Sequence, residues 1–173
     1  LGIDYSRRFI ETATMLQRDG ALDYSRTDEG ALTTRLTARV PVEVDRNRVR
    51  FETGDAMNLR SDIGVFDVVL MANLIDRLRE PECCLSRLPE MVKSGGQLII
   101  TSPYTWLEDF TPAGNWLGGY ERDGRRISTG EGLSEALAGS FELVTTKNLP
   151  FLIREHARKF QWSVAEATIW KRR

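Results

Sequence analysis

The alternation of hydrophobic and polar positions along the chain predicts strands that alternate with helices. Apolar residues recur at helical spacing between positions 9 and 16, with Ser6 as the expected N-cap and Gly20 as the expected end of the helix. The continuous apolar run at 66–72, interrupted by a single acid, is typical of a parallel strand covered on both faces. This pattern predicts one α/β domain that spans residues 1–173.

The remaining elements are predicted from shorter patterns. Further strands are expected at 1–4, 49–52, 97–101, 141–146 and 164–170, and further helices from Pro81 and from Ser128 to about Ala138. Two segments interrupt this alternation. Residues 21–48 predict a hairpin-like insertion, and the aromatic, glycine-rich residues 104–128 predict a substrate-side insertion with a small hairpin at 120–127.

Composition narrows the classes of function. Lysine and arginine together number 24 against 25 aspartates and glutamates, and this balance disfavours a nucleic-acid-binding surface. The apolar runs are shorter than a membrane span. One histidine and two adjacent cysteines do not form a spaced ligand cluster, so we expect neither a metal site nor a disulfide framework. These features favour a cytoplasmic protein.

Polar residues at the ends of predicted strands are the first candidates for chemistry. Asp4 ends its strand where a carboxylate either accepts hydrogen bonds from the ribose of a nucleotide cofactor or caps the following helix. Asp55, which follows the strand at 49–52, either accepts the amine of adenine or is an ordinary turn residue. Asn73 follows the strand at 66–72, where the crevice of an open α/β sheet begins.

With the helix–turn–strand unit at 92–100, these motifs resemble the class I S-adenosylmethionine-dependent methyltransferases. The resemblance implies a Rossmann-like α/β sheet of seven strands with an antiparallel last strand, and S-adenosyl-L-methionine as the cofactor. The cofactor-binding residues that it implies are Asp4, Tyr5, Asp55, Ala56, Met57, Asn73 and Leu74. The first strand and glycine-rich loop of that family, whose backbone approaches the methionine end of the cofactor, are expected before Leu1 and are absent from the chain as given.

Three longer strings resemble a narrower family, the C-terminal methyltransferase domain of the ovothiol-biosynthesis enzyme 5-histidylcysteine sulfoxide synthase. They are Thr-Ser-Pro-Tyr-Thr-Trp at 101–106, Trp-Leu-Gly-Gly at 116–119 and Arg-Glu-x-Ala-Arg-Lys-Phe-Gln at 154–161. The resemblance implies N-methylation of the imidazole of 5-thiohistidine (4-mercaptohistidine) to give ovothiol A. It also implies an upstream iron-dependent sulfoxide synthase domain as a partner.

The implied acceptor is a zwitterionic amino acid with an electron-rich ring, and several side chains suit it. Tyr104, Trp106 and Trp116 are candidates to stack on the ring. Arg154, Arg158 or Lys159 are candidates for the carboxylate, and Asp76 or Glu155 for the ammonium. The candidate catalytic residues, which would orient the ring, are Asn73, Tyr104 and Asp76. The alternative for each of them is a solvated charged turn or an aromatic core residue.

Other interpretations of the sequence stay open. His156, the single histidine, is expected to hydrogen-bond or pack rather than to act as a base. Within enzymes, the competing hypothesis is a methyltransferase for another small amine or hydroxyl. A second is a non-catalytic module that keeps the cofactor fold and docks onto a partner. A nicotinamide-binding Rossmann domain is disfavoured by the aromatic insertion and by the antiparallel last strand.

Overall fold

The computed structural model describes residues 1–173, which form two compact units. The first unit comprises Leu1–Ala56 with Leu152–Trp162, and the second comprises Met57–Phe151 with Ser163–Arg173. None of the helices in either unit combines the length and the apolar character needed to cross a bilayer.

The first unit begins with a short parallel pair of strands and one helix. Strands β1 (Gly2–Asp4) and β4 (Phe51–Thr53) pair in parallel, so that both end at the same edge. Helix α1 (Arg7–Asp19) follows β1 and leads to the hairpin that precedes β4. As predicted, the Ser6 side chain caps α1 by accepting from the amide of Phe9, and Gly20 ends it in a left-handed conformation.

The predicted hairpin-like insertion is a two-stranded antiparallel sheet. Strands β2 (Ala21–Glu29) and β3 (Leu32–Arg39) pair along nearly their whole length, with an irregularity beside Glu29. Gly30 makes the turn in a left-handed conformation, so the hairpin prediction is confirmed. A 3-10 turn at Arg46–Arg48 then leads to β4.

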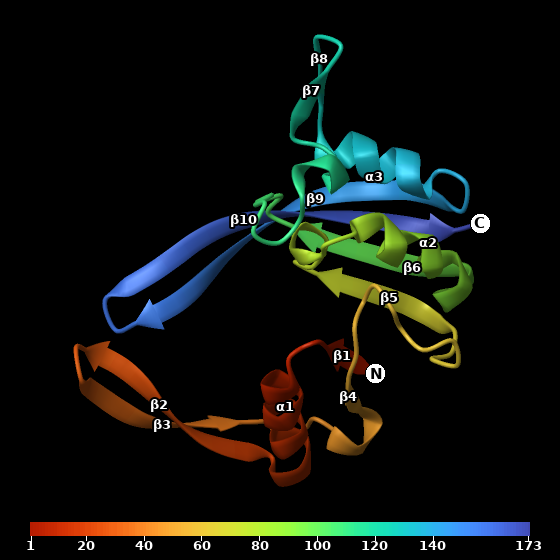
Figure 1. The fold of residues 1–173 in the computed structure, drawn as a ribbon. Helices are drawn as coiled ribbons and strands as arrows, with labels where there is room; N and C mark the ends of the chain where they lie inside the picture. Colours follow the sequence, from red (N-terminus) through yellow and green to blue (C-terminus); the bar gives the residue numbers. More distant parts are fainter. The chain divides into compact units, whose positions relative to one another are not determined.

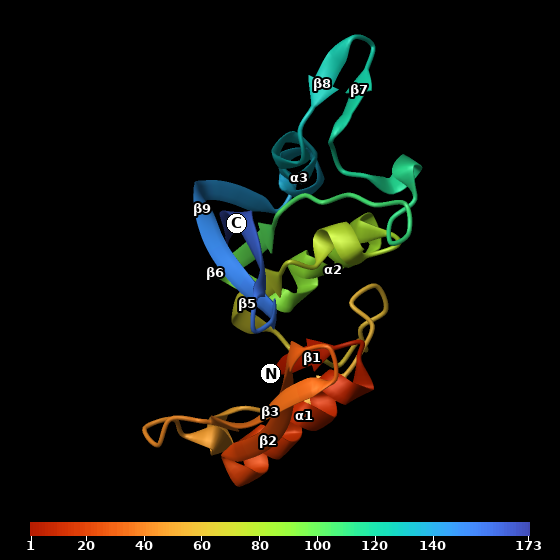
Figure 2. The ribbon, with the colours of Figure 1, turned by 90° about the vertical axis from the view of Figure 1, so that its left-hand side faces the viewer.

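The second unit is built on a mixed sheet of four strands in the order β5-β6-β10-β9. Strand β5 pairs in parallel with β6, and β10 pairs antiparallel with β6, with Ile169 opposite Ile99. Helices α2 and α3 lie over the same face of this sheet (Figures 1 and 2). The elements are β5 (Phe66–Ala72), α2 (Pro81–Met91), β6 (Val92–Ser102), β7 (Tyr120–Arg122), β8 (Arg125–Ile127), α3 (Thr129–Leu137), β9 (Phe141–His156) and β10 (Lys159–Arg172).

The core of the second unit lies between that face of the sheet and its two helices. Side chains alternate along β6, so Leu98 and Ile100 are buried, whereas their neighbour Ile99 is partly exposed. From the helices, Leu88 and Leu133 are also almost fully buried. The sheet therefore combines parallel and antiparallel neighbours with helices packed on it, which is the α/β arrangement that the sequence predicts.

The last two strands are longer than predicted. The sequence places them at 141–146 and 164–170, whereas β9 and β10 run without interruption to a tight turn after His156. Pro150 and the polar residues before it suggest a break, but β9 is an edge strand, where a proline that lacks an amide donor is tolerated. The segment expected as a loop between the last two strands is thus a hairpin arm.

Strand β6 also starts earlier than predicted. The sequence places a turn at 94–96 and the strand at 97–101, but pairing begins at Val92, opposite Phe66. The irregularity falls between that pair and Val68, and Gly95 takes a left-handed conformation within the same stretch. The glycines therefore form a bulge in the strand instead of a turn before it.

Close backbone packing explains part of the Trp-Leu-Gly-Gly string. A Cβ atom on Gly118 would lie 2.2 Å from the carbonyl carbon of Ser128, and one on Gly132 would lie 1.7 Å from the carbonyl oxygen of Leu117. The loop at 116–119 therefore crosses the first turns of α3 at a distance that only glycines permit. The predicted capping box of Ser128 and Glu131 starts this helix.

Candidate functional site

The candidate site in the second unit begins where β5 and β6 end. Asn73 follows β5 in a left-handed conformation with φ of 50°, which is uncommon for a residue other than glycine. Its amide donates to the carbonyl of Thr101 at 2.8 Å, and its side-chain oxygen accepts from the Thr101 hydroxyl at 3.0 Å. Asn73 is exposed, so its amide NH₂ group projects from a fixed backbone.

Asp76 lies immediately after this turn and is 1% exposed. Its Oδ2 atom accepts from the amide of Thr105 at 3.0 Å and from the Arg77 guanidinium at 3.3 Å. Its Oδ1 atom is buried and accepts no hydrogen bond. An unsatisfied carboxylate oxygen in a protein interior is costly, so it marks a position where a further donor would be bound favourably.

Tyr104 is the second residue of this edge with a left-handed backbone, at φ of 55°. Its amide donates to the Ser102 hydroxyl at 2.9 Å, and its phenolic hydroxyl donates to Oε2 of Glu166 at 2.7 Å. Burial, the hydrogen bond to Glu166 and the negative charges of Glu166 and Asp76 all raise the pKa of the Tyr104 hydroxyl. The phenol therefore stays protonated, and its hydrogen is directed to Glu166.

Glu166 was missed by the sequence reasoning. It lies on β10 opposite Ser102 of β6, and because those strands are antiparallel, the beginning of β10 meets the end of β6. The available signal was a single acid within the apolar stretch 164–170. Asp76, Tyr104 and Glu166 together give this edge two carboxylates and a phenol.

The two tryptophans pack on each other. Their ring centroids are 6.3 Å apart with an interplanar angle of 22°. Trp106 is buried and donates its indole hydrogen to the Thr129 hydroxyl at 2.9 Å, and the half-buried Trp116 donates to the carbonyl of Thr111 at 2.8 Å. Both polar ends are therefore engaged within the chain. Trp106 in particular connects the loop after β6 to the start of α3.

The candidate nucleoside-binding residues lie in the first unit, at the carboxyl ends of its parallel strands. Asp4 ends β1, and Gly54 after β4 donates its amide to the carbonyl of Asp4 at 3.0 Å. The Oδ1 atom of Asp4 accepts from the amide of Ser6 at 2.7 Å, while Oδ2 has no protein donor. Asp4 thus supports the start of α1 and also keeps one carboxylate oxygen exposed. Tyr5 beside it is 80% exposed.

The other implied cofactor residues are distributed over both units. Asp55 and Ala56 follow Gly54 in the first unit and are half-buried. Met57 and Leu74 belong to the second unit. The Met57 sulfur accepts from the amide of Glu80 at 3.3 Å, so it is held against the residue that precedes α2.

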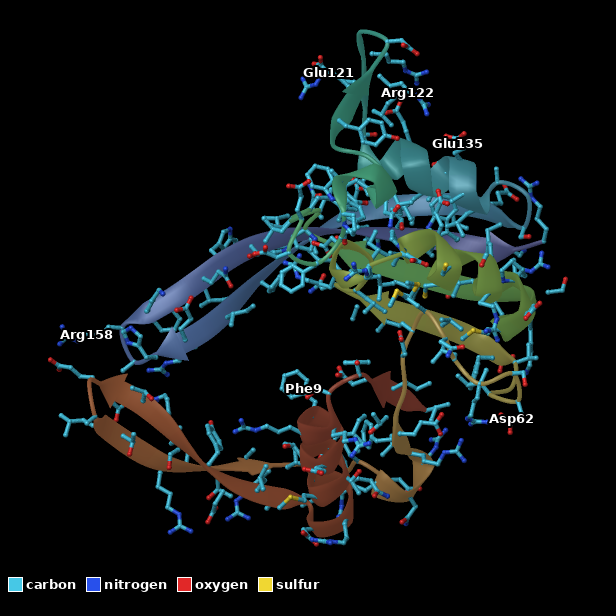
Figure 3. All side chains as sticks on the ribbon, viewed as in Figure 1. Phe9, Asp62, Glu121, Arg122, Glu135 and Arg158 are labelled. Carbon is cyan, nitrogen blue, oxygen red and sulfur yellow. The ribbon has the colours of Figure 1, made fainter.

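The charged residues predicted for the acceptor carboxylate lie at the tip of the β9–β10 hairpin, where Arg158 projects from the turn (Figure 3). The Arg154 guanidinium lies 5.4 Å from the centre of the Phe160 ring, and Glu155 pairs with Lys159 at 2.5 Å. His156 accepts from the amide of Arg158 at 3.2 Å through Nδ1. This cluster belongs to the first unit, whereas Tyr104 belongs to the second.

Comparison with solved structures gives the fold class. A protein of echinomycin biosynthesis that converts a disulfide bond into a thioacetal group has a TM-score of 0.57 at 14% identity, over 99% of this chain and 66% of its own. A SAM-dependent methyltransferase from Methanosarcina mazei has a TM-score of 0.56 at 14% identity, over 98% and 80%. The cyclase SpnF has a TM-score of 0.55 at 17% identity, over 98% and 65%.

The chain therefore has the α/β fold of class I methyltransferases, and it spans 65–80% of the lengths of these three proteins. No protein-family model and no curated protein sequence matches it. Because one protein with this fold is a cyclase, the fold by itself does not specify the reaction. The reaction depends on the side chains at the edge of the sheet.

Proposed function

We propose that this chain is an S-adenosylmethionine-dependent methyltransferase domain that methylates the imidazole of 5-thiohistidine. The observation that carries the proposal is the group of polar residues at the carboxyl ends of β5 and β6. Asn73 and Tyr104 are held there in left-handed conformations beside the buried Asp76. Strained, polar residues at the crevice end of an α/β sheet are typical of a binding or catalytic site.

The residues of the first unit fit the nucleoside of the cofactor. The free Oδ2 of Asp4 suits a ribose hydroxyl, and the backbone and side chain of Asp55 and Ala56 suit an adenine edge. When bound, S-adenosylmethionine supplies an activated methyl group on a sulfonium. The contribution of the chain is to hold the nucleoside, to exclude water and to orient the acceptor.

The proposed acceptor is supported by the strings at 101–106, 116–119 and 154–161, because they resemble the ovothiol-biosynthesis family. A neutral imidazole nitrogen attacks a methyl group without a strong base, which agrees with a site of amide, phenol and carboxylate groups. Asn73 and Tyr104 are proposed to orient the ring. We further propose that the domain works in the cytoplasm beside an iron-dependent sulfoxide synthase domain, which would supply the thiolated histidine.

An acceptor panel tests this proposal. The protein is incubated with methyl-labelled S-adenosylmethionine and, separately, with 5-thiohistidine, histidine and a small hydroxyl compound. The expected result is label transfer to 5-thiohistidine with a kcat/KM at least about tenfold above that for histidine, because the site is proposed to recognise the thiolated ring. Equal turnover of histidine would contradict the acceptor, although it would leave the methyltransferase intact.

The non-catalytic alternative is tested by the cofactor alone. A docking module that has lost cofactor binding shows no heat when titrated with S-adenosylhomocysteine. The proposed enzyme binds it, and substitution of Asp4 weakens that binding. Binding without transfer to any member of the panel would favour a regulatory role for the domain.

A further inference from the structure

The Tyr104 hydroxyl is oriented so that it offers lone pairs and no hydrogen to a ligand. Its single hydrogen is given to Oε2 of Glu166 at 2.7 Å. A phenol has one hydrogen to donate, and its oxygen also accepts hydrogen bonds. As long as Glu166 is ionised, the Tyr104 oxygen is therefore available only as an acceptor.

Glu166 itself has a free acceptor and a favourable environment for its charge. Its Oε1 atom accepts no hydrogen bond from the chain, whereas Oε2 is used by Tyr104. Oε2 also lies 3.8 Å from the position of a Cβ atom on Gly130, in the first turn of α3. The positive end of the helix dipole favours an anion at this place.

Asp76 gives an independent indication of what this edge attracts. Its carboxylate is buried, and one of its two oxygens has no partner. Arg77 lies 3.3 Å from the other oxygen and is the guanidinium paired with it. Two carboxylates and one guanidinium leave one net negative charge beside Tyr104, and the unpaired oxygens of Asp76 and Glu166 are acceptors.

We propose that Tyr104 and Glu166 form a subsite that binds a protonated amine of the methyl acceptor, with Asp76 as the buried negative charge behind them. A primary ammonium carries three hydrogens, and the Tyr104 oxygen and Oε1 of Glu166 accept two of them. The subsite discriminates against carboxylate and phosphate groups, which bring negative charge and no hydrogen to donate. The inference rests on the proposed function only in that the amine belongs to the acceptor of that reaction.

The matched variants follow from this arrangement. Glu166→Gln keeps the size of the side chain but removes its charge, and Tyr104→Phe removes only the hydroxyl. Glu135→Gln is the control, because Glu135 is an exposed glutamate on α3 (Figure 3). Thermal unfolding of each variant shows that it is folded before binding is compared.

The probes are 5-thiohistidine and its des-amino analogue, in which hydrogen replaces the amine, titrated calorimetrically into the protein saturated with S-adenosylhomocysteine. Loss of a charge-assisted hydrogen bond is expected to weaken binding of 5-thiohistidine to Glu166→Gln and Tyr104→Phe by about 10- to 100-fold. Binding of the des-amino analogue is expected to change less than about twofold in Glu166→Gln, and the Glu135→Gln control is expected to match the wild type in both titrations. In turnover of Glu166→Gln, KM for 5-thiohistidine is expected to rise while kcat at saturation stays within about threefold, as for a lost ground-state contact.

Equal weakening of both probes in Glu166→Gln would overturn the subsite, and so would unchanged binding of 5-thiohistidine. Failure of the wild type to bind 5-thiohistidine at all would also overturn it. Failure of the proposed function is recognised separately, because it appears in the wild type as absent cofactor binding or absent methyl transfer. An amine-dependent loss of binding in the variants supports the subsite even if methyl transfer is not observed.

Discussion

The left-handed backbone of Asn73 leads to a prediction in which two small substitutions have different effects. Asn73→Gly and Asn73→Ala both remove the side-chain oxygen that accepts from Thr101. They differ in the backbone, because φ of 50° is accessible to glycine and strained for alanine. The difference between the two variants therefore isolates the conformational strain at the end of β5.

The left-handed backbone at position 73 sets the expected difference in stability between the two variants. A left-handed conformation costs alanine about 1–2 kcal/mol, whereas glycine loses about 0.5–1 kcal/mol more backbone entropy on folding. Asn73→Ala is therefore expected to be about 1 kcal/mol less stable than Asn73→Gly, a difference of about 2–4 °C in Tm for a chain of this size. At the neighbouring Ala72, which lies within β5, the order reverses, and Ala72→Gly is expected to destabilise by about 0.5–1 kcal/mol.

Urea and thermal unfolding, followed by circular dichroism, measure both differences. Methyl transfer is measured on the same samples, and both variants at position 73 are expected to lose activity because both lack the amide group. Equal stability of Asn73→Gly and Asn73→Ala would refute the strained conformation. Full activity in Asn73→Gly would refute the role of the side chain.

Three further predictions concern the start of α3 and the nucleoside side. The capping hydrogen bond from the amide of Ser128 is the main cause that lowers the pKa of Glu131 to about 2 from its ordinary 4.5. The stabilisation by the Glu131 carboxylate is therefore complete above pH 4.5 and is lost as pH falls through 2. In urea, the wild type should unfold at a higher concentration than Glu131→Gln at pH 6, and at the same concentration near pH 2. Gly132→Ala forces a Cβ atom against the carbonyl of Leu117, so it should lower the free energy of unfolding in urea by about 1–3 kcal/mol or more. The control is Gly130→Ala in the same helix, where the added Cβ atom meets only ordinary contacts and should not destabilise the protein. Asp4→Asn should weaken S-adenosylhomocysteine binding about tenfold in calorimetry, and Ser6→Ala should lower stability by about 1 kcal/mol without that loss.

Much of the fold follows from local sequence signals. Ser6 and Gly20 define the ends of α1, and the capping box at Ser128 starts α3, because each of these signals satisfies backbone groups within a few residues. The length of β9 could not be predicted in the same way. Its residues after Thr146 include Pro150 and polar side chains, and only the hairpin partner β10 supplies the hydrogen bonds that keep them extended.

The residues of the candidate site likewise differ in whether local sequence signals predict them. Asn73 and Tyr104 were predicted because they follow strands at the carboxyl edge of a parallel pair, and the structure holds both in unusual conformations. Glu166 depends on the antiparallel register of β10 with β6, which no local pattern encodes. The burial of Asp76 was likewise not predictable, because it results from the loop after β6, whose Thr105 amide donates to it. Their roles in binding the acceptor stay predictions.

Methylation of the 5-thiohistidine ring can be observed directly with an isotope-labelled methyl group. The protein is incubated with labelled S-adenosylmethionine and 5-thiohistidine, and the product is examined by nuclear magnetic resonance and mass spectrometry. The proposed activity gives one labelled methyl group on an imidazole nitrogen, formed only when protein and both substrates are present. Unchanged 5-thiohistidine alongside bound cofactor, or label on its sulfur or its amine instead of the ring, would contradict it.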